Sequence, residues 1–390
     1  MKGKIKAETK ILIMLAFYSI SVGLWGNFRE LWLQDNNMNV STISNLLSIG
    51  TFLSAILILI SSKTIKLNKI KSLIAFSLFI KSINMLALFF INGTSLSLLF
   101  NCLIIIDIML EKLIVTSIYP LIVTIKKDDR LYSKRKLVEY LFRDIGILIG
   151  GIFIGRTIFS LNINYNACLM ISLIFAIIAY LILENIKIKT KEQKSEASLK
   201  VIFKDKIARL YIVYYFISQV AMKTGLGILM LMLTNQLKFT ASGATNYMLI
   251  VGLASDIIGI LALRYFTPKN DYITMAIKFG IRFLGYILAF ISNSFIMILV
   301  AITWSKLIST AYENKTDGVY INRIPTKYQL FFTDIRYVVG MLGESVGLLF
   351  AGITFNMGIR YTLGLSALFM IVQISMAYML IYMRRREKVK

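Results

Sequence analysis

The sequence contains no histidine, and its two cysteines, Cys102 and Cys168, stand far apart in apolar stretches. Without histidine there is no Ser-His-Asp triad, and zinc and haem sites lose their most common ligand. The cysteines form no CxxC pair, so we interpret them as small buried hydrophobic residues. No glycine-rich phosphate loop occurs, which argues against ATP-driven pumping by this chain. We therefore expect neither an enzyme nor a bound metal or cofactor.

Charged residues are also scarce: they make up 16% of the 390 positions, whereas hydrophobic residues make up 57%. A soluble domain usually has about 25% charged residues, and a disordered chain has few apolar ones. Three prolines and 23 glycines exclude a collagen-like or linker-rich protein. The remaining class is an all-α polytopic membrane protein.

Long apolar runs dominate what is present. A helix needs about 20 mostly apolar residues to cross a bilayer, and continuous rather than alternating runs favour helices over a barrel. The first run is too long for a signal peptide and has no small-residue cleavage site after it. Twelve candidate spans follow from these runs: 10–33, 42–61, 72–91, 95–125, 138–159, 166–184, 208–233, 245–265, 272–292, 294–312, 329–355 and 361–383.

The net charge of +24 comes from 44 Lys and Arg against 20 Asp and Glu. With the N-terminus in the cytoplasm, the segments on that side hold 32 Lys and Arg, whereas the outside loops hold only Lys238 and Arg360. Such asymmetry is typical of cytoplasmic loops. It predicts twelve spans with both termini cytoplasmic. The abundance of Ile, Lys and Asn suggests a bacterium, so we expect the protein in a bacterial inner or plasma membrane. We attribute the basic charge to this topology and to the lipid bilayer, and expect no nucleic-acid partner.

The longest polar loop, about 184–207, divides the spans into two sets of six. We expect an N-terminal six-helix lobe over 1–184, a cytoplasmic linker over 185–207 and a C-terminal six-helix lobe over 208–390. The fifth span of each half fits F-x-D-I-x-x-x-x-G, with Phe142 and Gly150 in the first half matching Phe332 and Gly340 in the second. Such internal repeats are common in transporters.

This layout of twelve spans, a basic central loop and cytoplasmic termini resembles the major facilitator superfamily over the whole chain. The loop around Lys63 and Lys66 matches the basic residues of that family's signature but lacks its acid and both glycines. Gly146, Gly150, Gly151 and Gly155 approximate its antiporter motif without the proline. The resemblance implies alternating access, with spans one, four, seven and ten lining a central cavity and spans three, six, nine and twelve at the periphery.

Charged residues inside the spans are the candidate functional residues, because charge at the bilayer centre is costly and usually faces protein or a water-filled cavity. Asp107 and Glu111 are four residues apart, so they share one helix face and do not ionise independently. We therefore interpret them as proton-coupling residues. Asp256 and Glu344 are further candidates in the second half. The alternative is a structural ion pair with Lys112, Arg29 or Lys223.

Candidates for binding a substrate come from the first, fourth and seventh spans. Lys223 could receive an anionic group, or it could be a fixed partner of Glu344 or Asp256. Trp25, Phe28 and Trp32 recur on one side of the first span and could form an apolar wall, although packing explains them equally well. Lys81 and Arg282, in expected peripheral spans, have no explanation from the sequence. The complete set of binding candidates is Arg29, Glu30, Lys112, Lys223, Trp25 and Phe28.

The resembled fold also suggests a cytoplasmic gate. Asp334 would meet Lys63 or Lys66 across the lobe interface, and Asp144 would meet Arg264 or Lys269. The alternative is that both acids only stabilise the first turn of their helices through the macrodipole.

Together these features predict a secondary active transporter, proton-coupled and monomeric, that moves a small amphipathic, zwitterionic or anionic solute. The glycines of the fifth span favour efflux by antiport. The alternatives are a proton-coupled uptake permease and a non-transporting membrane sensor or lipid-handling protein.

Overall fold

The computed structural model describes residues 7–64, 69–91, 97–125, 129–155, 161–186, 203–265, 279–292, 294–307 and 326–389. Within these ranges the regular structure is entirely helical. Seven of the described helical segments are long and apolar enough to cross a membrane, and two shorter apolar helices, Ile281–Ser292 and Phe295–Leu307, follow one another in the second half. The nearly all-helical fold agrees with the sequence.

The chain forms two compact units. Unit 1 comprises 1–39, 49–195 and 239–249, and unit 2 comprises 40–48, 196–238 and 250–390. The helices of the first half are α1 (Ala7–Gly26), α2 (Arg29–Asp35), α3 (Val40–Thr64), α4 (Ile70–Ile91), α5 (Ser97–Ile125), α6 (Asp129–Gly155) and α7 (Leu161–Glu184). The first residues of α3 group with unit 2, where Ser48 Oγ lies 2.8 Å from Ser345 Oγ.

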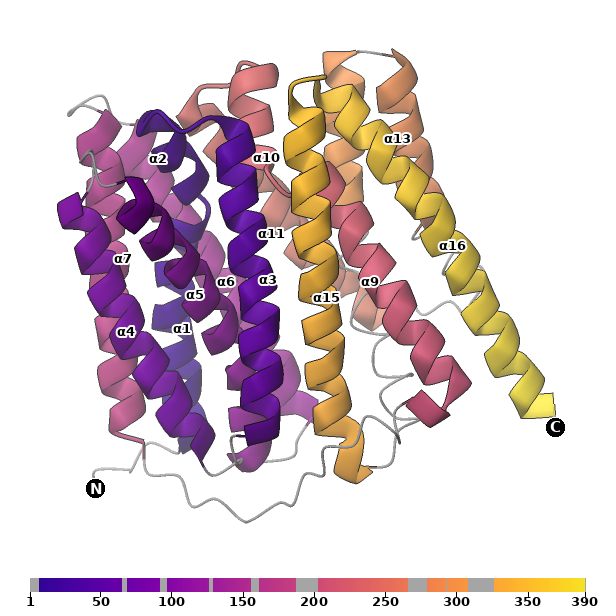
Figure 1. Ribbon diagram of the computed structural model, residues 1–390, viewed down its shortest axis with the longest axis horizontal. Coiled ribbons are helices and arrows are strands. Elements are labelled where there is room, and N and C mark those ends of the chain that lie inside the picture. Colours follow the sequence, from indigo (N-terminus) through magenta and orange to yellow (C-terminus); the bar gives the residue numbers. More distant parts are fainter. Residues whose placement is uncertain are drawn as a thin grey trace. The chain divides into compact units, whose positions relative to one another are not determined.

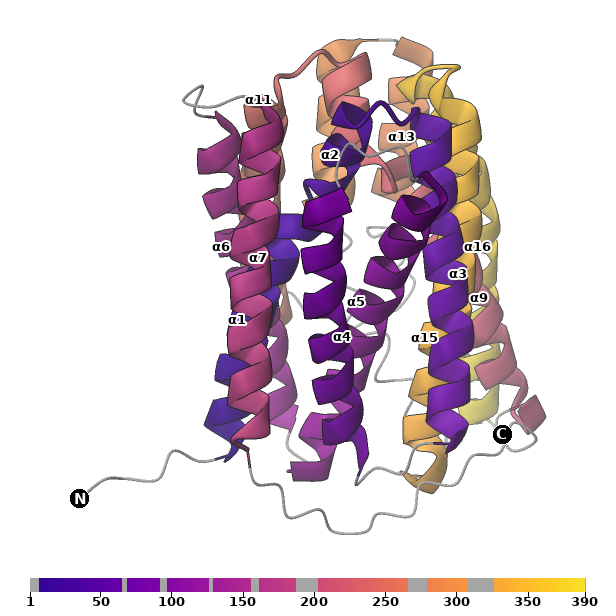
Figure 2. The ribbon, with the colours of Figure 1, turned by 60° about the vertical axis from the view of Figure 1, so that its left-hand side comes forward.

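The second half contains α9 (Lys206–Leu226), α10 (Leu229–Leu231), a π-helical turn (Met232–Gln236), α11 (Ala241–Tyr265), α13 (Ile281–Ser292), α15 (Thr326–Phe355) and α16 (Ile359–Val389). In unit 1, α1 packs against α6 and α7, and α4 packs against α5 and α7 (Figures 1 and 2). In unit 2, α9 packs against both α15 and α16, and α13 packs against α16 (Figure 1).

The helices are apolar on both their inner and outer faces. In unit 1, residues such as Met14, Leu78 and Ile118 are fully buried in one core. On the outer faces Phe76 and Phe90 are 64% and 71% exposed. A helix that is apolar all round is typical of a membrane span, whose outer face contacts lipid.

The first long helix of each half is interrupted at the same register. α1 ends at Gly26 and α2 begins at Arg29, while α9 ends at Leu226 and α10 begins at Leu229. The residues Asn37 and Lys238, which precede the next helix in each half, both have left-handed backbones, with φ of 61° and 58°. The sequence predicted single continuous spans here, because each interruption is only two residues long, Asn27-Phe28 in the first half and Gly227-Ile228 in the second. The structure therefore contains an internal repeat with an offset of about 200 residues.

Equivalent helix contacts recur in the two halves and correct the predicted register of the repeat. Ser172 Oγ donates a hydrogen bond to the Ser21 carbonyl, and Ser366 Oγ donates one to the Ala221 carbonyl. A Cβ on Gly146 would collide with the Ile20 carbonyl of α1, and a Cβ on Gly347 would collide with the Val220 carbonyl of α9. Gly146 and Gly347 are therefore equivalent.

The predicted match of Gly150 with Gly340 was wrong. Gly150 packs against the ring of Phe28, near the end of its unit's first helix, whereas Gly340 packs against Tyr215 in the middle of α9. The register of the repeat depends on where the helix backbones approach each other. A short glycine pattern can occur at several positions along a glycine-rich helix, so the pattern alone gave the wrong match.

Candidate functional site

Four charged side chains meet in the interior of unit 1. This buried charge cluster consists of Arg29 of α2, Lys81 of α4, and Asp107 and Glu111 of α5. Two cations face two anions, so the cluster is balanced in formal charge. Ionised groups are seldom buried in a protein unless they are paired in this way.

Asp107 is the centre of the cluster, and its side chain is 0% exposed. Lys81 Nζ lies 2.7 Å from Oδ1, and Arg29 Nη1 lies 2.9 Å from Oδ2. The indole Nε1 of Trp25 donates a hydrogen bond of 2.8 Å to the same Oδ2. Both carboxylate oxygens therefore accept short, charge-assisted hydrogen bonds, and the negative charge is fully matched.

Glu111 is held more loosely. Its Oε2 lies 3.3 Å from Arg29 Nη1 and 3.6 Å from Lys81 Nζ, and its side chain is 15% exposed. The carboxylate faces the end of α1, where a Cβ added to Gly26 would lie 3.7 Å from Glu111 Oε1. The two acids share the same cations but differ in distance and access.

Local structure explains how these residues meet. Asp107 and Glu111 are one turn apart on α5, as their spacing predicted. The interruption after Gly26 starts α2 at Arg29, which is 8% exposed in its side chain. On α4, Asn84 Nδ2 donates to the Leu103 carbonyl of α5 at 2.9 Å, which fixes the two helices in register beside Lys81.

Lys81 is the residue that the sequence did not assign to this site. It stands on a span expected at the periphery, yet it is only 1% exposed and its long side chain reaches Asp107. The predicted structural pairing of Asp107 with Arg29 is present. Lys112 is half-buried on α5, while Lys223 belongs to unit 2.

The aromatic side chains beside the cluster are packed. Trp25, Phe28 and Trp32 are each no more than 1% exposed. The Trp25 and Trp32 rings meet edge to face with centroids 5.1 Å apart. This agrees with packing, and a contact of Trp25 or Phe28 with a substrate stays a prediction. Glu30 is half-buried at the start of α2.

In unit 2, Lys223 Nζ of α9 lies 2.6 Å from Glu344 Oε1 of α15, with side chains 26% and 12% exposed. Of the two partners that the sequence allowed for Lys223, the structure therefore pairs it with Glu344. The side chain of Asp256 lies outside the described residues.

The gate residues are only partly described. Lys66, Lys269 and the side chain of Arg264 lie outside the described residues. The pairing of Asp334 with Lys63 or Lys66 therefore stays a prediction. So does the pairing of Asp144 with Arg264 or Lys269. The alternative reading as first-turn acids was wrong. α6 begins at Asp129 and α15 at Thr326, so Asp144 and Asp334 are both well inside their helices.

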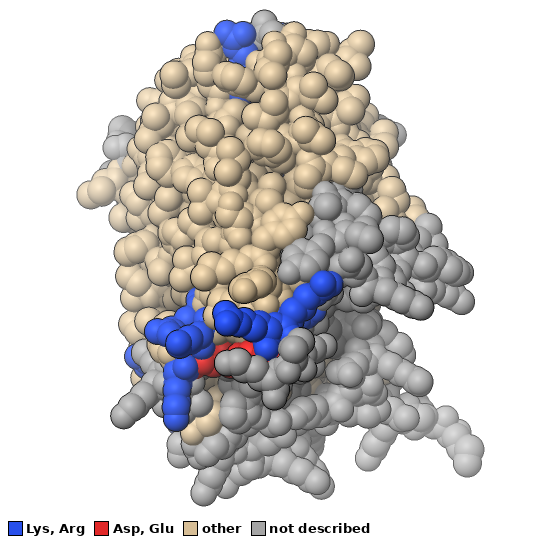
Figure 3. Space-filling model, turned by 90° about the vertical axis from the view of Figure 1, so that its right-hand side faces the viewer, with Lys and Arg blue, Asp and Glu red and all other residues tan. Residues whose placement is uncertain are grey.

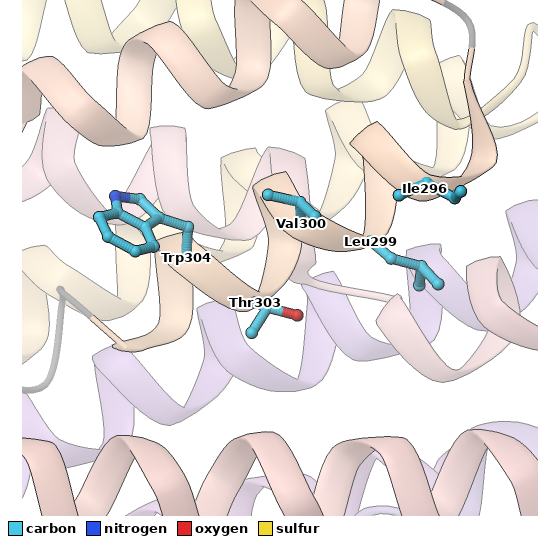
Figure 4. A pocket seen from close by; sticks show the side chains of 5 residues that line it. All are labelled: Ile296, Leu299, Val300, Thr303 and Trp304. Atoms are coloured by element: carbon cyan, nitrogen blue, oxygen red, sulfur yellow. The ribbon is translucent and has the colours of Figure 1, made fainter.

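A hollow of about 240 Å³ lies along the apolar helix 295–307. All five of its lining side chains come from this one helix: Ile296, Leu299, Val300, Thr303 and Trp304 (Figure 4). Ile296 and Val300 are 69% and 53% exposed, and the lining contains no charged group. These properties fit a surface that contacts lipid tails, and we do not interpret the hollow as a substrate site.

No family model matches the sequence, and no curated protein matches it. Solved structures do match. The nucleoside transporter NupG aligns over 97% of this chain and 99% of its own, with a TM-score of 0.69 and 12% identity. A bacterial homologue of the iron transporter ferroportin, in an inward-facing state, aligns over 97% and 99% of the two chains, with a TM-score of 0.72 and 11% identity.

The human organic anion transporter MFSD10 aligns over 95% of this chain and 98% of its own, with a TM-score of 0.69 and 13% identity. At such low identities these likenesses bear on the fold alone, and they extend over nearly the whole chain. The protein has the fold of the major facilitator superfamily transporters.

Proposed function

We propose that the protein is a proton-coupled secondary active transporter that exports a small amphipathic, zwitterionic or anionic solute by alternating access. The fold is that of known transporters, and the balanced charge cluster of unit 1 provides titratable groups at mid-span. The observation that carries the proposal is the difference between the two carboxylates of the cluster.

Glu111 is the proposed proton carrier. The Asp107 side chain is fully buried and accepts three short hydrogen bonds. Protonating it would leave Lys81 and Arg29 without their main partner. Glu111 is 15% exposed and 3.3 Å or more from either cation, so it can take up or release a proton at smaller cost. Its proton would weaken the link between α2, α4 and α5, which couples protonation to helix movement.

The proposed solute class follows from the donors near this site. Arg29 keeps one donor, Nε, that has no hydrogen-bond partner among the described residues. Lys223 in unit 2 is the most exposed of the paired intramembrane cations described above, at 26%. Donors of this kind favour a solute with an anionic group. Export is favoured by the resemblance of Gly146, Gly150, Gly151 and Gly155 to an antiporter motif.

The proposed topology has twelve spans in two six-helix lobes, with a linker over 185–207 and both termini in the cytoplasm of a bacterial cell. It is supported by the distribution of 32 Lys and Arg on one side against two on the other. Figure 3 shows Lys and Arg gathered in a band toward the lower end of one face, below a broad uncharged surface. A broad uncharged surface is what a lipid-facing belt requires.

The experiment has two stages. A thermal-shift screen of nucleosides, organic anions and zwitterionic amino acids first identifies a solute that stabilises the purified protein. That solute is then followed in liposomes under an imposed pH gradient. The wild-type protein should move the solute against its gradient when protons flow the other way. Movement in the same direction as the protons would indicate the uptake permease.

Glu111→Gln should abolish pH-driven transport but leave the thermal shift by the solute largely intact. Glu184→Gln is the matched control, because Glu184 is a 49% exposed acid of unit 1 that lies 3.9 Å from Lys71 Nζ. Unchanged proton coupling in Glu111→Gln would remove Glu111 from the mechanism and turn attention to Asp256 and Glu344. A solute that binds but is never moved would instead favour the sensor or lipid-handling alternative.

A further inference from the structure

Arg282 is a buried cation in unit 2 that the proposed function does not use. It lies on α13 and is only 5% exposed. Its guanidinium carbon stands 5.5 Å from the centre of the Tyr286 ring. Its Nε and Nη2 atoms are buried, and neither has a hydrogen-bond partner in the described part of the chain. Burying guanidinium donors without a partner is costly, so this arrangement calls for an acceptor.

The internal repeat shows what is missing. Arg282 follows Lys81 by the same offset that relates Asn37 to Lys238 and the start of α3 to that of α11. In unit 1 the cation on the third long helix meets Asp107 at 2.7 Å. The same offset takes Asp107 to Ile308, which lies just outside the described residues. Three residues earlier, helix 295–307 presents Ser305, which accepts a hydrogen bond of 3.0 Å from the Tyr286 hydroxyl. Arg282 therefore corresponds to Lys81, but helix 295–307 has no acid that corresponds to Asp107.

The helices that the described contacts place beside α13 have no acid near Arg282 either. Phe279, two residues before α13, contacts Tyr214 of α9, and Tyr286 of α13 lies against Gly225 of α9 and donates to Ser305. These contacts place α13 beside α9 and helix 295–307, and it also packs on α16. None of α9, α13 and helix 295–307 contains Asp or Glu, and α16 has none before Glu387.

A second unsatisfied polar group lies in the same part of unit 2. Gln373 of α16 is 1% exposed and donates through Nε2 to Ser218 of α9 at 2.7 Å. Its Oε1 is buried without a hydrogen-bond partner in the described residues. Along α9, Ser218 falls between Tyr214 and Gly225, the residues that flank the level of Arg282. Two buried polar groups therefore need partners within one stretch of the helix bundle.

The chemistry of the missing acceptor follows from which atoms are unsatisfied. Nε and Nη2 are the two donors along one edge of the guanidinium plane, and that edge matches the two oxygens of a carboxylate or phosphate. Arg282 lies ten residues, or about 15 Å along a helix, from the end of α13 at Ser292, and ten residues from the start of the span expected over 272–292, so it is too deep for a lipid headgroup. We propose that Arg282 binds a carboxylate or phosphate group inside unit 2, supplied by a free anion or by the solute itself.

The test uses the purified full-length protein in nanodiscs of neutral lipid. Sodium acetate and sodium phosphate are titrated against sodium chloride at constant ionic strength, and the unfolding midpoint is followed. A saturable rise with acetate or phosphate is expected, because a ligand that binds only the folded state stabilises it. Arg282→Gln should weaken the apparent affinity at least about tenfold, since the two-point contact is lost.

Arg360→Gln is the matched control, because Arg360 also stacks on a tyrosine, Tyr361, but already donates from Nη2 to its hydroxyl. It should leave the titration unchanged. In sodium chloride without acetate or phosphate, Arg282→Met should be at least as stable as the wild type, since it removes an unpartnered buried cation. A lower midpoint for Arg282→Met under this condition would show that Arg282 is already satisfied within the protein and would overturn the proposal.

A final arm separates the two sources of the anion. If acetate and phosphate give no shift, the solutes of the screen are tested on wild type and Arg282→Gln. A shift with anionic but not with neutral solutes, lost in Arg282→Gln, assigns the site to the solute. No anion-dependent shift in either arm overturns the proposal. Neither result depends on transport. The experiments can therefore reject proton-coupled transport and support the anion site at Arg282, or support transport and reject the site.

Discussion

The Lys81–Asp107 pair should behave as a buried ion pair whose members cannot be removed singly. Lys81→Met would leave Arg29 facing two carboxylates in the interior of unit 1, and breaking a buried pair in this way typically costs about 3–5 kcal/mol. The double variant Lys81→Met/Asp107→Asn keeps the charges of the cluster balanced, so its free energy of unfolding should fall much less. Thermal unfolding midpoints of the purified variants measure both.

The exposed pair of Lys71 and Glu184, 3.9 Å apart in the same unit, supplies the comparison. Lys71→Met should cost about 1 kcal/mol or less. If Lys81→Met destabilises the protein as little as Lys71→Met, Lys81 and Asp107 do not form a buried pair of the expected strength. The same follows if Lys81→Met/Asp107→Asn is as unstable as Lys81→Met.

At the level of residues, the sequence predicted the acids of the site but not all of its cations. The spacing of Asp107 and Glu111 determines a common helix face whatever surrounds the helix. The partnership with Lys81 depends on which helices pack together, which one sequence does not specify. A usable signal was present: Lys81 lies ten residues before the end of α4 and Asp107 ten residues after the start of α5, so consecutive antiparallel spans place them at similar depth.

At the level of helices, Gly146 and Gly347 should be equally intolerant of a side chain. Each lets a backbone carbonyl of the unit's first long helix approach closely, at Ile20 and Val220 respectively. Gly146→Ala and Gly347→Ala should each destabilise the protein by about 1–3 kcal/mol, the usual cost of overpacking. Gly280→Ala is the control, because a Cβ there meets nothing within 4 Å. Thermal unfolding of the three variants is the measurement.

A small effect at Gly347 alongside a large one at Gly146 would contradict the equivalence of the two helix contacts. The sequence suggested close packing through the glycines of the fifth span, but it matched Gly150 with Gly340. Hydrophobic patterns also missed the interruptions after Gly26 and Leu226, because each break spans only two residues and apolar residues continue on both sides of it.

At the level of the whole molecule, the layout of spans and charges was enough to indicate the fold. Identities of only 11–13% accompany TM-scores of 0.69–0.72 with the transporters named above. Bilayer thickness and the side preference of Lys and Arg constrain every such chain, whereas the residues of a binding site are free to change on a common fold. The substrate therefore could not be read from the sequence, although titratable groups inside the spans could.

The proposed topology predicts which positions can be labelled from outside the cell. Cys102 and Cys168 are first replaced by serine, which leaves no native thiol. Lys238→Cys and Arg360→Cys, in the two outside loops that carry a basic residue, should react with a membrane-impermeant maleimide in intact cells. Lys10→Cys and Arg385→Cys should react only after permeabilisation, because the basic ends of the chain remain in the cytoplasm. Labelling of Lys10→Cys in intact cells would place that terminus outside. Labelling at only one of Lys238→Cys and Arg360→Cys would mean that the number of crossings between them is odd, which contradicts the twelve-span arrangement.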